Sequence, residues 1–376
     1  MADEKLTQKA KDHVQQAGDN AQQIQAGTVI INNGLNESQV RAICSEMSYK
    51  AMEEYTAESH LTVEKRISDF ANVLIPRIEK IENGFEAFAD PEFQVELKKA
   101  QISSACTDRE ADYEMLAELL LHRVENKDNR RVKASITKAV EIVDKIDDDA
   151  LQALTVAYSV IQFTPTNGMI KDGLNTLNYY FGQLPIKQLP KDNSWVSYLD
   201  ILDVIRASQI GNFKKMITIY SEKLTGYLAV GIKKESENYY KAIEILNKAN
   251  MNEKVFVEHE LIDGYLRLPV PNKEYISETK RTINIPQLGI TLPVLLSDNE
   301  KTALYQVWEL YEKNGGLINQ IREKFAELVN SFENLVITKE WWDSIPNSFG
   351  ITPIGRVLAH ANAQRYAKIP ELELGK

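Results

Sequence analysis

The sequence has little cysteine, no long apolar run and no glycine-rich phosphate-binding loop. Only Cys44 and Cys106 occur among 376 residues, and neither has a second cysteine or a histidine at metal-ligand spacing. We therefore expect reduced thiols, as in a cytoplasmic protein. No uninterrupted apolar run approaches about 18 residues, and the first residues are polar, so the sequence predicts neither secretion nor a membrane span.

Catalytic motifs are also missing from the sequence. It contains no Gly-rich phosphate loop, no pair of histidines one helical turn apart with an intervening Glu, and no Gly-x-Ser-x-Gly turn. The adjacent Glu258, His259 and Glu260 point about 100° apart on a helix, which predicts a solvated face rather than a metal site. We therefore expect no catalytic residue, no cofactor and no metal.

The charge of the chain argues against a polyanionic partner. The formal net charge is -10, which opposes non-specific attraction to nucleic acid or to anionic lipid. One segment is basic nevertheless, and its residues are Arg123, Lys127, Arg130, Arg131, Lys133 and Lys138. It lacks aromatic residues for base stacking, so we expect it to neutralise the acidic helix that precedes it rather than to bind nucleic acid.

What the sequence does have is helical periodicity over most of its length. The fold class that it predicts is mainly α: a multi-helical array with a long N-terminal helix, one N-terminal strand, and a C-terminal β-hairpin plus helices in a winged-helix-like module. The expected divisions are a mobile tail with an oligomerisation strand (1–35), an N-terminal helical domain (36–184), a second helical domain (185–268) and the C-terminal module (269–376).

The segment Ile24–Asn32 is β-branched, short and closed by Asn-Gly, and it reads as an isolated strand. No second strand signal follows within two hundred residues, so its backbone groups need a distant partner. The strand of another chain is the preferred partner. The alternative is the hairpin predicted around 280–296 of the same chain, where apolar residues alternate around Pro286–Gly289.

The helix that follows is expected to run from Asn36, in a capping box with Gln39, to about Ile75 before Pro76. At about 1.5 Å per residue it would be roughly 58 Å long, and the alternative is a break at Ser59–Thr62. Apolar residues form a narrow seam on it, which consists of Val63, Ile67, Phe70 and Leu74. We predict that this seam and the strand residues Ile24, Val29 and Ile31 join chains into an oligomer.

Two further groups of residues have more than one interpretation. Asp108, Glu110, Asp112 and Glu114 place carboxylates on one helical face, as in a magnesium site for phosphodiester hydrolysis, but acidic residues at a helix start explain them more simply. Trp341 and Trp342 lie before the last helix, which Thr352 and Pro353 open. Paired tryptophans at such a place anchor a core, form a partner surface or, least in favour, stack on a ligand.

Both ends of the chain resemble known sequences. The run Gly18–Asn32 is similar to a short tag of bacterial multidomain proteins linked to phage defence, with matches at Gly18, Asn20, Gln23, Ile24, Ala26, Gly27, Val29 and Ile31. The segment Phe349–Asn362 resembles the end of an uncharacterised bacterial family that carries this tag. This resemblance implies a bacterial protein in antiviral defence and offers no catalytic residues. The pattern Thr352-Pro353-x-Gly355 is also similar to the end of winged-helix domains.

These observations favour an oligomeric interaction protein, a scaffold or sensor with an unidentified protein partner. The first alternative is a metal-dependent nuclease or phosphohydrolase whose carboxylates come from separate helices. The second is a nucleic-acid-binding protein that uses the Arg123–Lys138 segment, which the net charge does not favour.

Overall fold

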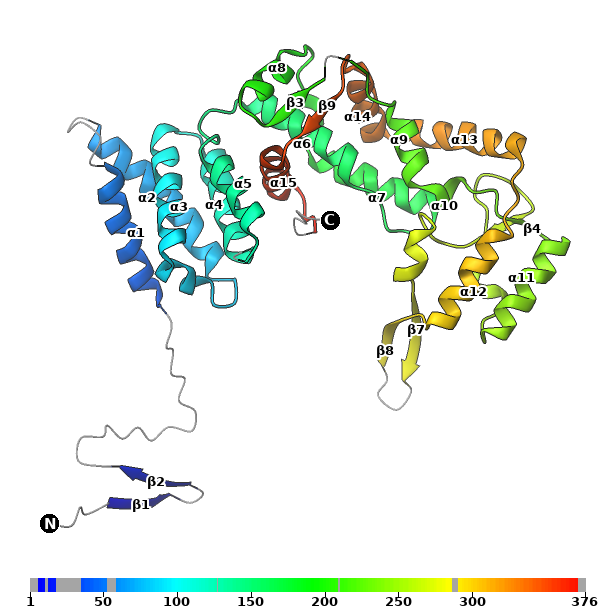
Figure 1. Cartoon of the computed structure of the whole chain (residues 1–376), viewed down its shortest axis with the longest axis horizontal. Coiled ribbons are helices and arrows are strands. Elements are labelled where there is room, and N and C mark those ends of the chain that lie inside the picture. The colour runs from blue at the N-terminus through cyan, green and yellow to red at the C-terminus, as the bar shows by residue number, and fades with distance from the viewer. Residues whose placement is uncertain are drawn as a thin grey trace.

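The computed structural model describes residues 35–52, 59–126, 128–208, 210–285 and 290–370, together with strands β1 (Leu6–Ala10) and β2 (His13–Ala17), which pair antiparallel. Within these residues the chain is mainly helical, as predicted, with a few small strands. The helices form an elongated arc, with α1–α5 at one end and α11 and α12 at the other (Figure 1). No helix of the described part is both long and apolar enough to cross a membrane.

Five helices make the N-terminal array: α1 (Glu37–Met52), α2 (His60–Ile78), α3 (Pro91–Cys106), α4 (Glu110–Glu125) and α5 (Arg130–Val140). A short η1 turn (Gly84–Ala89) joins α2 to α3. The predicted capping box opens α1, because the Asn36 N–H donates to Gln39 Oε1 at 2.9 Å and the Gln39 N–H donates to Asn36 Oδ1 at 3.0 Å. Asp90 caps α3, which starts at Pro91.

The prediction of one long N-terminal helix was wrong. Helices α1 and α2 pack side by side, and α1 also packs on α3 (Figure 1). The two halves of one straight helix cannot contact each other, so α1 and α2 are separate helices. Burial explains the preference for two helices, because both can then place apolar side chains on α3. Pro76 does not end α2, which continues to Ile78.

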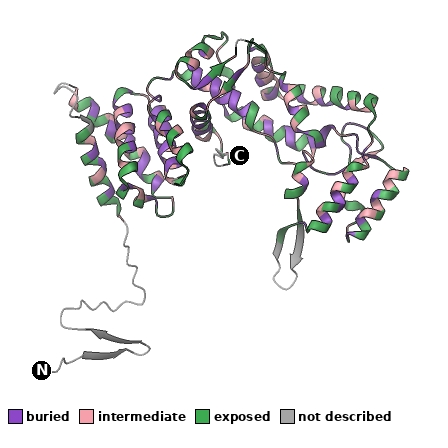
Figure 2. Ribbon diagram, viewed as in Figure 1, coloured by how far each residue is buried: buried purple, intermediate pink, exposed green. Residues whose placement is uncertain are grey.

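The middle of the arc is built on α6 (Asp148–Gln162) and α7 (Ile170–Gln183). It also contains η2 (Ile186–Gln188), α8 (Ser194–Ile201), β3 (Ile205–Ala207), α9 (Met216–Lys223), α10 (Thr225–Leu228), α13 (Gly315–Asn330), α14 (Glu333–Ser344), β9 (Phe349–Ile351) and α15 (Pro353–Tyr366). Ten residues of α6 are buried, and purple covers it in Figure 2. One connected apolar core runs through the array and this middle part.

A second, smaller core occupies the far end of the arc. It contains β4 (Ile232–Lys233), α11 (Glu237–Lys248), η3 (Glu253–Val255), β5 (Val257–Glu258), β6 (Tyr265–Arg267), η4 (Glu274–Glu278) and α12 (Asp298–Glu309). Strands β4, β6 and β5 form an antiparallel sheet in that order. Ile232, Leu246, Ile276 and Leu304 are among its buried side chains. The two cores do not follow the predicted divisions at 185 and 269, since the first core draws on residues from both ends of the chain.

The last helix belongs to the first core rather than to a C-terminal module. Helix α15 packs against α4, α5 and α6, and β9 pairs antiparallel with β3 (Figure 1). The side chain of Thr352 accepts a hydrogen bond from the Gly355 N–H, which confirms the predicted cap. The winged-helix interpretation was wrong, because β9 shares no sheet with the hairpin that precedes α12.

That hairpin confirms the prediction at 280–296. Strands β7 (Lys280–Ile285) and β8 (Ile290–Leu295) pair antiparallel with Ile283 opposite Leu292. They form a two-stranded sheet of their own that projects from the body beside α12 (Figure 1). The buried Ile276 before β7 and Leu296 after β8 fix its base in the second core.

Candidate functional site

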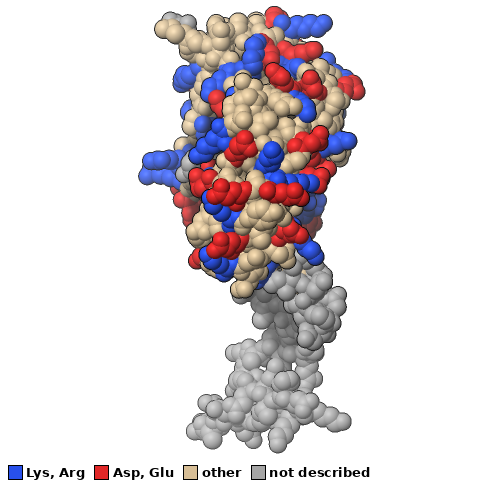
Figure 3. Space-filling view, turned by 90° about the vertical axis from the view of Figure 1, so that its right-hand side faces the viewer, with Lys and Arg blue, Asp and Glu red and all other residues tan. Residues whose placement is uncertain are grey.

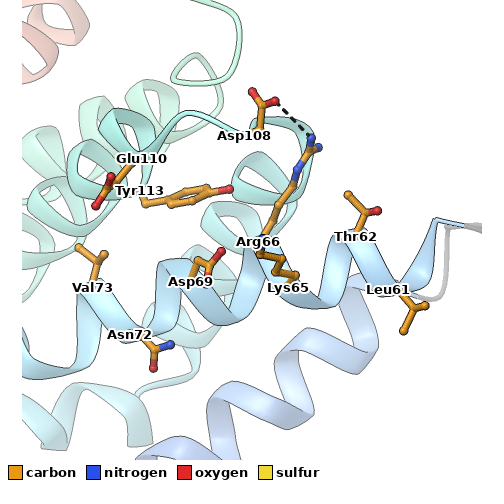
Figure 4. Close-up of a pocket in the computed structure, with 10 residues that line it drawn as sticks. All are labelled: Leu61, Thr62, Lys65, Arg66, Asp69, Asn72, Val73, Asp108, Glu110 and Tyr113. Carbon is orange, nitrogen blue, oxygen red and sulfur yellow. Dashed lines mark ion pairs between the residues drawn. The ribbon is translucent and has the colours of Figure 1, made fainter.

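A cleft of about 670 Å³ lies between α2 and the start of α4 (Figure 4). Its walls come from residues 61–73 of α2 and from residues 108–113, which lead into α4. The lining residues are Leu61, Thr62, Lys65, Arg66, Asp69, Asn72, Val73, Asp108, Glu110 and Tyr113. At about 1.5 Å per residue, the α2 wall extends for about 18 Å, so the cleft is elongated along one helix.

Helix periodicity places these residues. The buried stripe of α2 is Val63, Ile67, Phe70 and Leu74. Lys65, Asp69 and Asn72 follow at the same spacings of four and three residues, so they form a second stripe that turns away from the core. The amphipathic pattern that buries one face of α2 therefore also presents a polar face to the cleft.

The opposite wall is held in place by hydrogen bonds. Arg66 donates from Nη1 to the Ala105 carbonyl at 2.9 Å, and its Nη2 lies 4.0 Å from Asp108 Oδ2 (Figure 4). The hydroxyl of Tyr113 donates to the Thr107 carbonyl at 3.0 Å. Burial raises the pKa of Tyr113, so this phenol stays protonated and keeps donating. The loop between α3 and α4 is thus tied to α2 on one side and to α4 on the other.

The charged residues of α4 and those of the cleft differ in whether they form ion pairs. Along α4, Asp112 pairs with Arg109, Glu114 with Arg77 and Arg365, and Glu118 with Arg77. In the cleft, Lys65, Asp69 and Glu110 form no ion pair with any described residue. Beside the Arg66–Asp108 pair, charged side chains of both signs therefore line a concave surface without an ion-pair partner in the described part of the chain, which makes the cleft the strongest candidate site.

The structure separates the four carboxylates that the sequence grouped. Asp108 and Glu110 line the cleft, whereas Asp112 is buried, accepts a hydrogen bond from the Thr107 hydroxyl at 2.6 Å and pairs with Arg109 at 2.9 Å. Burial raises the pKa of Asp112 although Thr107 and Arg109 oppose it. Glu114 faces α15 through Arg365. Within the described residues no group of three or more His, Cys, Asp or Glu side chains is placed to hold a metal.

Much of the basic segment is neutralised by nearby carboxylates. Arg123 and Lys133 both contact Glu92 Oε2, at 3.0 and 2.5 Å, and Lys138 contacts Glu141 at 2.8 Å. These contacts hold the pKa of the Glu92 and Glu141 carboxyls below the usual value. Lys127 lies outside the described residues. At the far end of the arc, positive and negative side chains are also intermixed on the face that Figure 3 shows.

The predicted oligomerisation seam lies inside the chain. Val63, Ile67, Phe70 and Leu74 are each at most 3% exposed and pack within the array. They do not form the intermolecular seam that the sequence predicted. Apolar residues spaced by four, three and four positions indicate a buried helix face, but this spacing is the same whether the same chain or another chain covers that face. The strand residues Ile24, Val29 and Ile31 lie outside the described residues.

The two tryptophans pack into the core, which is the interpretation that the sequence favoured over a partner surface. Trp342 is 1% exposed and donates from Nε1 to the Lys214 carbonyl at 3.0 Å. Trp341 is partly buried, stacks on Trp195 at a ring distance of 5.8 Å and donates to the Pro190 carbonyl at 3.1 Å. Both indole N–H groups therefore have partners within the chain.

The group Glu258, His259 and Glu260 also differs from its predicted solvated helix face. Glu258 ends β5, and His259 is buried with Nε2 at 2.9 Å from the Ala229 carbonyl. Glu260 accepts hydrogen bonds from the N–H groups of Ile170 and Lys171, and it pairs with the buried Arg267 at 2.6 Å. These residues join the second core to the start of α7 and are structural.

Sequence reasoning missed the cleft itself. Its α2 stripe was detectable, because Lys65, Asp69 and Asn72 keep helical spacing, but no local pattern indicates that the residues at the start of α4 lie opposite them. No curated protein and no solved structure matches this chain. One family model does match, and it covers residues 34–376, so it includes the closing segment but not the tag at 18–32. The chain belongs to this uncharacterised protein family.

Proposed function

We propose that the protein is an oligomeric interaction scaffold that binds a segment of a partner protein in the cleft between α2 and α4. The observation that carries the proposal is the set of charges in the cleft, Lys65, Asp69 and Glu110, which have no ion-pair partner among the described residues. A charged group inside a concave site gains most from a partner that brings the opposite charge.

The shape of the cleft favours a chain segment over a compact metabolite. Its wall follows α2 for about 18 Å, with the exposed Leu61 near one end and Val73 at the other. A bound segment would place apolar side chains at these ends and charges of both signs between them. The antiviral role rests on the resemblance at 18–32 and remains a prediction.

The test is a charge swap that keeps the net charge. Lys65→Glu with Asp69→Lys exchanges two cleft charges one helical turn apart. The matched control is Glu237→Lys with Lys241→Glu, which exchanges an exposed i,i+4 pair on α11. Full-length proteins are used to capture partners, which are identified by mass spectrometry, purified and titrated by calorimetry. We expect the cleft swap to weaken binding at least tenfold and the control to leave it unchanged.

Two outcomes would contradict the proposal. One is a set of partners that bind the cleft variant and the control equally well. The other is hydrolysis of single-stranded DNA or of a phosphodiester substrate that requires added Mg²⁺ or Mn²⁺, which would favour the hydrolase instead. A salt-dependent affinity for DNA that falls on Arg130→Glu would favour the nucleic-acid-binding alternative.

A further inference from the structure

We propose that the β7–β8 hairpin dimerises the chain by antiparallel pairing of β7 with β7 of a second copy. The inference concerns a different surface from the α2–α4 cleft and does not depend on it. The hairpin stands apart from the body in Figure 1, with its base fixed by Ile276 and Leu296. A two-stranded sheet is marginally stable in water, and further strands with an apolar face stabilise it.

The hairpin has exposed apolar side chains but only two strands. Leu292, Val294 and Leu295 of β8 are 43%, 39% and 53% exposed. No described strand pairs with the outer edge of either β7 or β8. Such edges are templates for another strand, and exposed apolar residues beside them increase the gain from pairing.

Proline leaves only one of the two edges available. Pro293 lies in the middle of β8, opposite Thr282. A proline has no N–H, so a paired strand tolerates it only where its nitrogen faces away from the neighbouring strand. The nitrogen of Pro293 therefore faces away from β7, at the outer edge of β8, where it cannot donate a hydrogen bond to a further strand. The outer edge of β8 is therefore interrupted. In an antiparallel ladder, two residues opposite each other turn their N–H and C=O groups either both toward the partner strand or both away from it. Because Pro293 faces away from β7, the N–H and C=O of Thr282 face away from β8, at the outer edge of β7.

The alternation of the ladder fixes which β7 residues can pair with another chain. Lys280, Thr282 and Asn284 share the outward orientation, and Pro286 comes only after the strand ends. Antiparallel pairing of two β7 strands centred on Thr282 sets Thr282 opposite its own copy and Lys280 opposite Asn284.

The charge pattern of β7 favours an antiparallel orientation of the second copy. The basic residues Lys280 and Arg281 both lie at the start of β7, and residues 282–297 carry no charge. The antiparallel arrangement separates the two basic pairs to opposite ends of the ladder, whereas parallel pairing would place like charges side by side. Because each chain offers one uninterrupted edge, the pairing closes as a twofold dimer.

The small area of contact sets the expected strength. A standard interface uses about 20–30 residues on each side, and the six residues of β7 with neighbouring β8 side chains fall well short of that. We therefore expect a dissociation constant in the micromolar range. The full-length protein is studied by sedimentation velocity over a concentration series from about 1 to 200 μM.

Two substitutions have opposite expected effects. Thr282→Pro removes the central outward N–H of β7 and should weaken dimerisation at least tenfold, while Thr282→Val, which keeps the N–H, should not. Pro293→Thr restores an N–H on the outer edge of β8, which opens a second edge and should convert the dimer into larger, concentration-dependent assemblies. Ile201→Ser, at a site that is 81% exposed on α8, controls for loss of an exposed apolar side chain and should leave the dimer unchanged.

Circular dichroism and the melting temperature confirm that each variant folds. A wild-type protein that stays monomeric at 200 μM overturns the inference. So does a dimer that Thr282→Pro leaves intact in a folded variant, or a Pro293→Thr protein that remains a dimer. The Lys65 and Asp69 charge swap should not change the sedimentation of the protein, so failure of the cleft proposal and failure of the hairpin proposal are distinguishable.

Discussion

Arg365 on α15 donates a hydrogen bond from Nε to Oε2 of Glu114 on α4 over 3.0 Å, and the two positions are 251 residues apart in the chain. Arg365 is also bound by Asn362 Oδ1 at 2.8 Å. Glu114 lies 3.9 Å from Arg77 of α2 on its other side. This contact joins the last helix to the N-terminal array.

We expect Arg365→Ala to lower the free energy of unfolding by about 1–3 kcal/mol, because a hydrogen-bonded carboxylate loses its nearest cation in a partly buried place. Arg206→Ala is the control, since its ion pair with Asp203 has both side chains more than half exposed and should contribute at most about 0.5 kcal/mol. Urea unfolding measures both. Equal losses in the two variants would mean that the Arg365 contact adds nothing beyond a surface pair.

Gly355 and Gly350 provide a matched pair on either side of Thr352. A Cβ at Gly355 would lie 2.2 Å from the Val204 carbonyl oxygen, which is backbone and cannot move aside, whereas a Cβ at Gly350 meets nothing within 4 Å. Gly355→Ala should therefore cost about 1–3 kcal/mol. Gly350→Ala should be neutral or slightly stabilising. The test is the melting temperature of both variants compared with that of the wild type. An unchanged melting temperature for Gly355→Ala would show that α15 can shift away from β3.

Two buried histidines predict a loss of stability in mild acid. Burial lowers the pKa of both His259 and His360 to about 4, and for His360 the nearby His122 adds to the effect. Both are neutral in the folded chain, while the unfolded chain binds protons with a pKa near 6.5. Their contribution to the free energy of unfolding is complete above pH 6.5 and falls as the pH decreases toward 4. At pH 5 each histidine should have lowered this free energy by about 2 kcal/mol.

The measurement is the free energy of unfolding at pH 7 and pH 5 for the wild type and for His360→Gln. The variant should be less stable at pH 7, because Tyr158 loses its contact with His360 Nδ1 at 3.2 Å. It should lose less stability between pH 7 and pH 5 than the wild type does. A pH dependence that is identical in both proteins would exclude His360 as a source.

The two thiols should react differently. Burial raises the pKa of Cys44 to about 12, and its side chain is enclosed, whereas Cys106 is exposed. Only a thiolate attacks a disulfide reagent. At pH 8 we expect Ellman's reagent to modify one thiol per folded chain and both thiols in denaturant, and Cys106→Ser should abolish the fast reaction. Two fast thiols in the native protein would mean that α1 opens away from α3.

Local features of the fold could be predicted from the sequence, because their partners lie within a few residues. The capping box at Asn36 and the cap at Thr352 form as predicted, and Ser297 and Glu300, which have the Ser-x-x-Glu pattern, form a capping box as well. Thr107 and Glu110 have the related Thr-x-x-Glu pattern but form no such box, since the Thr107 hydroxyl donates to the buried Asp112 instead. Competition from a charged acceptor within the same turn explains this difference.

Contacts between segments that are distant in the chain could not be predicted from the sequence. The apolar stripe of α2 has the same spacing whether α3 and α4 or another chain cover it, so Val63 and Phe70 could not be assigned to one or the other. The cleft depends on the approach of residues 108–113 to α2, and the place of α15 depends on contacts across the whole chain. No local pattern encodes such approaches, which is why both were missed.

The position of α15 also constrains the order in which the protein forms during synthesis. Helices α4, α5 and α6 present the surface that α15 covers, and α15 is synthesised long after them, because α6 ends at Gln162 and α15 begins at Pro353. Until then the nascent chain exposes an apolar groove that none of its earlier segments fills, and such surfaces attract chaperones and promote aggregation. Contacts of this sequence separation also slow folding. Docking of α15 is therefore expected to be a slow and late step of folding.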